Sequence, residues 1–184
     1  MEQPVYDRTA RRLHWWTAVL VLTSGPLGLC QATVPDEAMA DFLLRAHLTL
    51  GLVIIALTLV RVVHSVVSPR PPLPDSVTGR RRLGAKVVHR TLILLLLAIS
   101  VAGVAVWITS DLPLMPWSAT REAIDRASAA AMTHRVLAYL FTALAIVHVV
   151  GVTAHDAIHP GTIGRMRRAR AVPEPGLVEA ERVG

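Results

Sequence analysis

Apolar residues in this chain gather into four long runs separated by short polar stretches. Each run has about 20 residues, the length that an α-helix needs to cross the hydrocarbon core of a bilayer. None of the runs shows the alternation of apolar and polar residues that a membrane β-strand requires. The pattern therefore predicts an all-α, integral membrane four-helix bundle, with spans at Leu13–Thr33, Ala46–Val67, Thr91–Thr109 and Met132–Ala154.

The composition supports a membrane protein. The chain is 53% hydrophobic and only 17% charged, and its mean hydropathy is +0.49. A soluble globular domain typically has about 25% charged residues. Its 184 residues are enough for one domain. We expect a single membrane domain over residues 1–170, followed by a disordered cytoplasmic tail over residues 171–184, which is rich in proline and acidic residues.

The basic residues predict the orientation of the spans. They cluster before the first span, between the second and third, and after the fourth, whereas the other two connections hold few. The positive-inside rule then places both termini and the middle connection in the cytoplasm. Topology therefore accounts for the net charge of +6 and disfavours nucleic-acid binding by "GRRRLGAK". The three clusters are Arg8, Arg11 and Arg12; Arg70, Arg80, Arg81, Arg82, Lys86 and Arg90; and Arg165, Arg167, Arg168 and Arg170.

The first span resembles a signal peptide, because arginines precede it and Cys30 follows Leu27 in a position loosely like that of a lipoprotein. However, its apolar run is too long for a signal core, and Leu29 is bulky where a cleavage site needs a small residue. We expect it to remain a span. Cys30 is the only cysteine, so no internal disulfide forms, and the absence of C-x-x-C-H excludes the usual covalent attachment of a c-type haem.

Three further segments carry local predictions. The proline-rich stretch Ser68–Ser76, "SPRPPLPDS", predicts a non-helical connector. The stretch Arg121–Met132, "REAIDRASAAAM", predicts a short surface helix that leads into the fourth span. Gly25 and Pro26 lie within the first span, where they are expected to kink or loosen the helix.

All eight histidines lie in or close to the spans, and ionisable groups at such depth usually mark function. They fall into layers. The outer ends of the second and fourth spans carry His47 and His134; the inner ends of the first and third carry His14 and His89. The inner half of the fourth span holds His148 and His155, and His64 and His159 lie at or beyond the inner boundary.

The spacing within the fourth span sets two of these histidines on one side of a helix. His134 and His148 are 14 residues apart, which is about 21 Å along the axis and only about 40° around it. Phe141 lies midway on this stripe, and His155 continues it one heptad further. Two metal centres stacked across a membrane need this spacing, because each receives one imidazole from the shared helix. Imidazole is a common axial ligand of haem iron, and two facing helices can hold one flat macrocycle between them.

Each layer then needs a second ligand. On the outer side the remaining histidine is His47, which predicts a His47–His134 pair. On the inner side His148 has two candidate partners, His14 and His89. Gly51 lies on the face of His47 and leaves room for a macrocycle. Arg61 lies on that face at the inner level, where it either binds the haem carboxylates or snorkels to the interface.

Other metals fit this pattern less well. Zinc and copper sites favour clustered ligands with help from carboxylates or thiolates. Here the histidines come singly from separate helices, so the layered set favours haem iron. For His64 and His159 an interfacial anchoring role is the simpler interpretation. Taken by itself, His14 would have the same interpretation, because Trp15 and Trp16 beside it are ordinary interfacial aromatic residues.

The ordered set of motifs resembles the bacterial cytochrome b561 family of four-helix dihaem membrane proteins, over residues 6–166. The likeness is carried by "YDRTARRLHWW", by "HLTLGLVIIALTLVRVV" with "SPRPP", by "HRTLILLLLAISVAGVAVW" and by "THRVLAYLFTALAIVHVVGVTAH". The resemblance implies two haem b groups, the inner one ligated by His14 and His148 and the outer one by His47 and His134. It also implies that His89 and His155 lie nearer the quinone chemistry.

The resemblance further implies an inner-membrane oxidoreductase that passes electrons between haem and a ubiquinone-type membrane quinone, with superoxide or a periplasmic protein as the donor. One alternative is a haem-bearing anchor subunit of a hydrogenase-like or dehydrogenase-like complex. The other is a transporter that uses the histidines as a proton or metal-ion relay. The four predicted spans hold no Asp or Glu, which disfavours a transporter.

Overall fold

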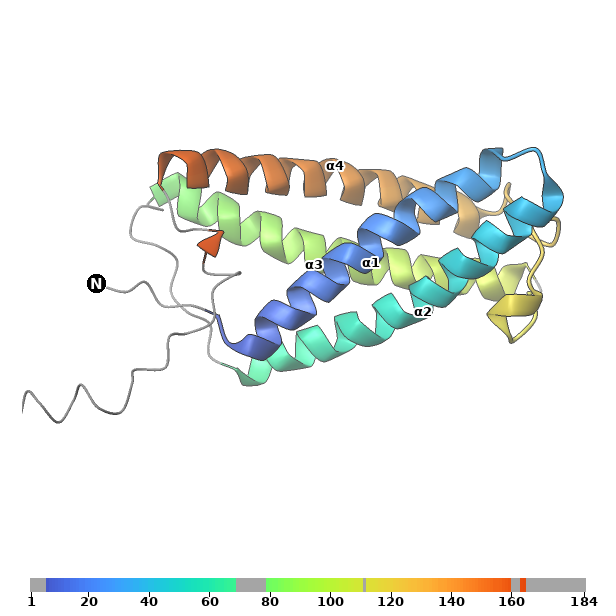
Figure 1. The fold of residues 1–184 in the computed structure, drawn as a ribbon, viewed down its shortest axis with the longest axis horizontal. Helices are drawn as coiled ribbons and strands as arrows, with labels where there is room; N and C mark the ends of the chain where they lie inside the picture. Colours follow the sequence, from blue (N-terminus) through green and yellow to red (C-terminus); the bar gives the residue numbers. More distant parts are fainter. Residues whose placement is uncertain (1–5, 69–78, 111, 160–162, 165–184) are drawn as a thin grey trace, which may run out of the picture.

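A computed structural model describes residues 6–68, 79–110, 112–159 and 163–164, and within this part of the chain it shows four long helices and no strand (Figure 1). All four are long and apolar enough to cross a membrane. The predicted all-helical membrane fold is therefore confirmed. The elements are α1 (Arg8–Thr33), α2 (Glu37–Val67), α3 (Gly79–Thr109), the 3₁₀ turn η1 (Pro116–Ser118) and α4 (Ala129–Ile158).

Each helix is longer than the span predicted for it, because polar residues extend it beyond the apolar run. Three of the N-termini are capped by a side chain that accepts a hydrogen bond from the first turn. Asp7 accepts from the Ala10 amide at 2.9 Å, Asp36 from Met39 at 2.7 Å and Ser128 from Ala131 at 3.2 Å. Helix α1 continues through Gly25 and Pro26 without interruption.

The helices pack as two hairpins. Helix α1 lies along α2 and α3 along α4, whereas α2 and α3 contact each other much less (Figure 1). At one end of the bundle α1 and α3 begin and α2 and α4 finish; we call it the terminal end. The other end holds the turn between α1 and α2 and the segment of residues 112–128, and we call it the loop end.

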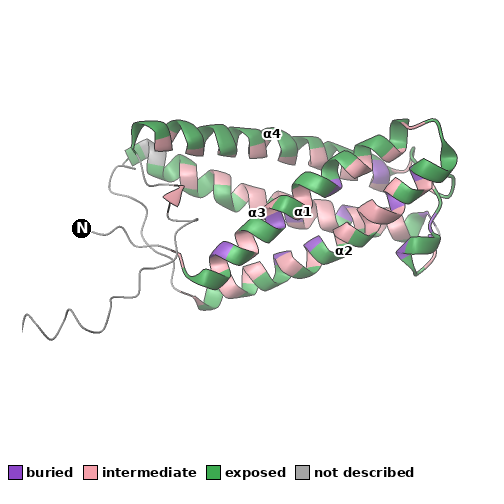
Figure 2. Cartoon of the chain, viewed as in Figure 1, coloured by how far each residue is buried: buried purple, intermediate pink, exposed green. Residues whose placement is uncertain are grey.

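The small apolar core lies at the loop end. Its buried members are Leu44 on α2, which is 2% exposed, with Leu112 and Ala119, and partly buried side chains such as Trp107 pack against them. Along the rest of the bundle many large apolar side chains are exposed, and α4 is green over most of its length in Figure 2. Such exposure is expected of helices whose outer faces contact lipid.

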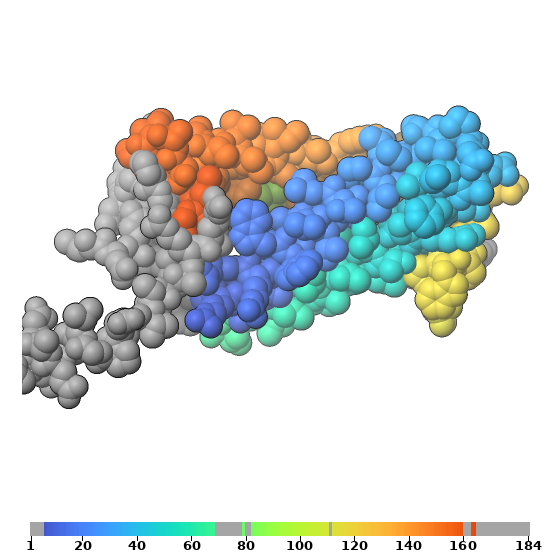
Figure 3. All heavy atoms as spheres, in the orientation of Figure 1, coloured from blue at the N-terminus to red at the C-terminus, as the bar shows by residue number. Residues whose placement is uncertain are grey.

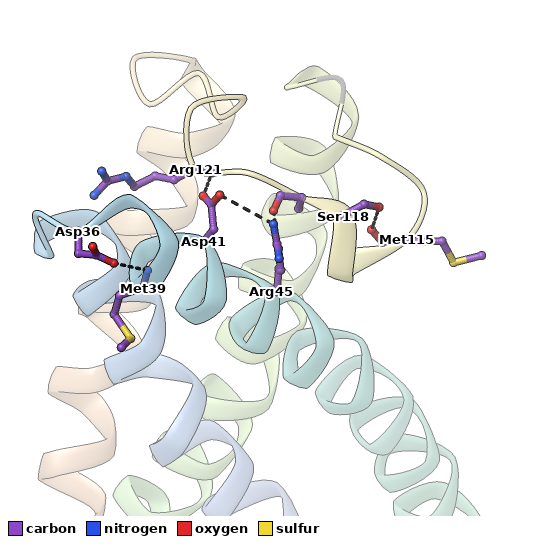
Figure 4. Close-up of polar contacts among 8 residues, drawn as sticks. Asp36, Met39, Asp41, Arg45, Met115, Ser118 and Arg121 are labelled. Carbon is purple, nitrogen blue, oxygen red and sulfur yellow. Dashed lines mark hydrogen bonds and ion pairs between the residues drawn. The ribbon is translucent and has the colours of Figure 1, made fainter.

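The segment of residues 112–128 lies on the surface beside α2 (Figure 3) and is held there by arginines and one carboxylate. Asp41 of α2 accepts from the Arg121 amide at 2.6 Å and lies 3.8 Å from the Arg45 guanidinium (Figure 4). The Arg121 side chain donates to the Val34 carbonyl at 2.6 Å, and Arg126 to Ala32 at 3.4 Å. Both acceptors lie at the C-terminus of α1, where positive charge is favourable.

The short surface helix predicted in Arg121–Met132 is wrong. Residues 121–128 form turns, and the helical part of the stretch belongs to α4, which begins at Ala129. Other hydrogen bonds replace helical ones. Ser110 Oγ, just after the end of α3, accepts from the Asp125 amide at 3.3 Å, and within the segment Asp125 Oδ1 accepts from the Ala127 amide at 3.0 Å. The predicted proline-rich connector, apart from Ser68, and the predicted disordered tail lie outside the described residues.

Candidate functional site

At the loop end the two hairpins bring one histidine each to a common level. His47 of α2 and His134 of α4 face each other with ring centroids 6.1 Å apart and planes at 80°. A metal–imidazole bond is about 2 Å long and the ring centre lies about 1 Å beyond the nitrogen, so one metal between two axial rings separates their centres by roughly 6 Å. The separation fits an iron held between the rings.

The hydrogen bonds of these rings leave the correct nitrogen for a metal. His47 Nδ1 lies 2.8 Å from the Ser24 carbonyl and 3.0 Å from Ser24 Oγ, and His134 Nδ1 lies 3.0 Å from the Ile99 carbonyl. A carbonyl oxygen only accepts, so in both rings Nδ1 carries the proton and Nε2 carries the lone pair. Histidines that bind a metal through Nε2 commonly donate Nδ1–H to a carbonyl in this way.

Two glycines on the neighbouring helices make room for the rings. A Cβ at Gly28 of α1 would lie 2.8 Å from His47 Cε1, and one at Gly103 of α3 would lie 3.2 Å from His134 Cε1. Each histidine therefore packs into a notch formed by a glycine of its own hairpin partner. Gly51 differs, since a Cβ built there meets no atom of the described residues within 4 Å, apart from its chain neighbours and the adjacent backbone of its own helix, so its side would accommodate a macrocycle. Sequence reasoning identified Gly51 but missed Gly28 and Gly103.

Replacing Gly28 with alanine is expected to displace His47, although alanine is the better helix former by about 1 kcal/mol. The new methyl group would overlap the ring, and such overpacking typically costs about 1–3 kcal/mol. We expect loss of a large part of the metal or cofactor bound at His47, measured as bound cofactor per chain. Gly25→Ala is the matched control, because a Cβ at that position of the same helix meets nothing within 4 Å. Equal cofactor content in Gly28→Ala and Gly25→Ala would contradict the claim that Gly28 makes room for the His47 ring.

At the terminal end each of the four helices contributes one candidate ligand or cofactor-binding side chain to a second level of the bundle. His89 of α3 and His148 of α4 have ring centroids 4.8 Å apart, and His14 of α1 is close enough to interact electrostatically with both. Arg61 of α2 places Nη2 3.3 Å from His14 Nδ1. The structure thus gathers the four side chains that the sequence analysis considered for the inner haem: the three candidate ligands and Arg61.

The two candidate partners of His148 are held differently. His89 Nδ1 donates to the Ala85 carbonyl at 2.7 Å, which leaves Nε2 as the ligand atom, but its ring is closer to His148 than the roughly 6 Å that an intervening metal requires. His14 Nδ1 accepts from Arg61, because a guanidinium has only donors. In this arrangement the proton of His14 is on Nε2, so binding iron there requires that proton to move or the ring to turn.

The remaining histidines also lie at the terminal end. His64 Nε2 is 3.5 Å from Asp7 Oδ1 and 3.2 Å from Ser68 Oγ, which agrees with an interfacial packing role. His155 lies seven residues beyond His148 on the uninterrupted helix α4, and its ring centroid is 4.9 Å from that of His159.

The described residues contain no group of three or more His, Cys, Asp or Glu side chains arranged to hold a metal ion. A structural or catalytic zinc ion takes at least three protein ligands. Histidine pairs from facing helices instead suit a metal whose other positions are filled by a macrocycle, as in bis-histidine haem. The donor set at the loop end, two imidazoles whose Nδ1 atoms donate to carbonyls and whose Nε2 atoms carry the lone pairs, fits haem b.

Comparison with known proteins agrees with this chemistry. The model of the prokaryotic cytochrome b561 family matches residues 5–169. Among curated proteins, cytochrome b561 homolog 2 of Escherichia coli (strain K12) is 28% identical over 151 residues, which cover 78% of this chain and 80% of the relative. The chain therefore belongs to the prokaryotic cytochrome b561 family, whose members are multi-pass inner-membrane proteins that transfer electrons with b-type haem.

Proposed function

We propose that this chain binds two haem b groups, each between two histidines, and passes electrons between them and membrane quinone. The observation that carries the proposal is the His47–His134 pair, whose rings are spaced for one iron and whose Nδ1 atoms both donate to backbone carbonyls. We assign the second haem to His14 and His148, as the family resemblance implies, and the 4.8 Å between the ring centroids of His89 and His148 supports this choice over His89. When bound, haem supplies reversible one-electron chemistry at each level.

The chain positions the two levels through α4. His134 and His148 are on one continuous helix, so their levels are about 21 Å apart along its axis. Arg61 lies beside His14, where its guanidinium would bind a haem carboxylate with charge-assisted hydrogen bonds. His155 and His89 at the terminal end hydrogen-bond the quinone and exchange protons with it, since quinone reduction consumes protons as well as electrons.

We propose that the terminal end lies in the cytoplasm and the loop end in the periplasm, as the positive-inside rule predicts from the basic clusters. We propose superoxide as the donor for the His47–His134 level, as the resemblance to the cytochrome b561 family suggests.

The proposed function is tested by a reduced-minus-oxidised absorption spectrum of the purified protein together with a haem count. We expect two low-spin b haems per chain, both extractable by acidic organic solvent because the chain has no C-x-x-C-H motif. A colourless protein that is saturated with zinc would exclude the proposal. A single haem per chain would limit the proposal to one haem, held by the His47–His134 pair.

A further inference from the structure

One arginine of the first cluster differs from its neighbours. Arg8, Arg11 and Arg12 lie within the first turns of α1, and Arg8 and Arg12 are exposed. Arg11 is 9% exposed, and its Nη1 atom is buried without a hydrogen-bond partner. Membrane topology requires only positive charge on the correct side, which the two exposed arginines supply. It does not require a buried guanidinium.

Burying a charged group is costly unless an opposite charge or hydrogen bonds compensate it. The nearest acidic side chain in sequence, Asp7, is already engaged: its Oδ1 accepts from the Ala10 amide at 2.9 Å and lies 3.5 Å from His64 Nε2. Arg11 contacts this residue through the backbone, where its amide donates to the Asp7 carbonyl at 3.2 Å. The Nη1 end of the Arg11 guanidinium thus has no acceptor among the described residues.

Arg11 is one helical turn from His14. Three residues separate them, which is about 4.5 Å along α1 toward the terminal end and about 60° around the axis. Arg61 of α2 already donates to His14 from the other hairpin helix. The level of His14 thus carries two guanidiniums, and the one from Arg11 has a buried N–H pair aimed at no acceptor of the described chain.

We propose that Arg11 is a binding site for an anionic oxygen, a carboxylate or a phosphate, that another molecule brings to the terminal end. Two sources have this chemistry. One is a propionate of the haem at His14, and this source rests on the proposed function. The other is the phosphate of an anionic lipid headgroup at the membrane interface. Arginine suits both, because its planar fork of donors matches carboxylate and phosphate oxygens.

The haem source is tested on the holoprotein by redox titration of Arg11→Gln, Arg11→Lys and the control Arg12→Gln in phosphatidylcholine nanodiscs. Removing a positive charge near a haem favours its oxidised form. At a fixed ambient potential we expect the ratio of reduced to oxidised haem at the His14 level to fall about tenfold in Arg11→Gln. Arg11→Lys should recover part of this loss, and Arg12→Gln should match the unmodified chain. A reduced-minus-oxidised infrared spectrum with ¹³C-labelled propionates should show a shifted carboxylate band in Arg11→Gln alone.

The lipid source is tested by thermal unfolding of the same variants in nanodiscs of phosphatidylcholine with and without phosphatidylglycerol. If a lipid phosphate is the ligand, phosphatidylglycerol stabilises the unmodified chain and Arg12→Gln but not Arg11→Gln, and the propionate band does not shift. The proposal is overturned if Arg11→Gln and Arg12→Gln agree in both the redox and the lipid measurements. Haem content, counted in every sample, shows separately whether the dihaem proposal holds. If Arg11→Gln does not fold, Arg11→Lys replaces it in both comparisons with Arg12→Gln, since lysine keeps the positive charge but lacks the planar fork of donors.

Discussion

Replacing His47 or His134 with alanine is expected to remove one of two haems and leave the other in place. Each substitution deletes an axial nitrogen at the loop end, and its partner, 6.1 Å away by ring centroids, cannot replace it. The levels are about 21 Å apart along α4, so the loss should not spread to the terminal end. The haem-to-protein ratio should fall from about two to about one, and the remaining haem should keep its low-spin spectrum.

The complementary variants His14→Ala and His148→Ala should lose the haem at the terminal end and keep the other. His64→Ala is the matched control, because this histidine lies at the same end but contacts Asp7 and Ser68, and both haems should remain. The result that would reassign the ligands is retention of both haems in His14→Ala together with loss of one in His89→Ala. His89 would then be the partner of His148, and the two rings would have to separate from 4.8 Å to admit the iron.

Replacing His155 with alanine is expected to leave both haems bound and to lower quinone reduction by about tenfold or more, which is within the range for loss of a general acid–base group. His155 lies seven residues from His148, about 10.5 Å further along α4, which is too far to share its iron but close to the cytoplasmic interface that we propose. The measurement is the rate of quinone reduction by chemically reduced protein, with haem content determined on the same sample.

The control for this experiment is again His64→Ala, which changes a histidine at the same end of the bundle without touching the proposed quinone site. Its turnover should equal that of the unmodified chain. Unchanged turnover in His155→Ala would return His155 to an interfacial role, and loss of a haem would make it a ligand. The double variant His89→Ala/His155→Ala tests whether the two histidines deliver protons together. If they do, the double variant should lose less quinone-reduction activity than the sum of the two single losses in free-energy terms.

Hydrophobic length predicted the four helices because an apolar run of bilayer length has few other stable arrangements. The helix ends were underestimated, since capping residues such as Asp36 and Ser128 lie in polar sequence outside the apolar runs. The helix predicted after Arg121 was wrong because its backbone is recruited by contacts distant in sequence, as when Asp41 accepts from the Arg121 amide. Local propensity cannot report a bond to a residue 80 positions away.

At the site, helical periodicity placed the histidines in levels, and the structure gathers His47 with His134 and His89 with His148 there. Periodicity along one helix could not identify Ser24, Ile99, Gly28 or Gly103, because their roles depend on which helices are neighbours. It also could not separate Arg11 from Arg8 and Arg12, since burial of one arginine in a cluster is a tertiary property.

Helix α4 contributes a histidine to both levels, and this has a consequence for biosynthesis. The chain is made from its N-terminus, so α1, α2 and α3 are synthesised before any residue of α4 exists. With the proposed ligands, a nascent chain that has inserted only its first three helices holds one half of each histidine pair and no complete site. Haem loading is then a late step of maturation, and its completion reports that the whole four-helix topology has been inserted in the membrane.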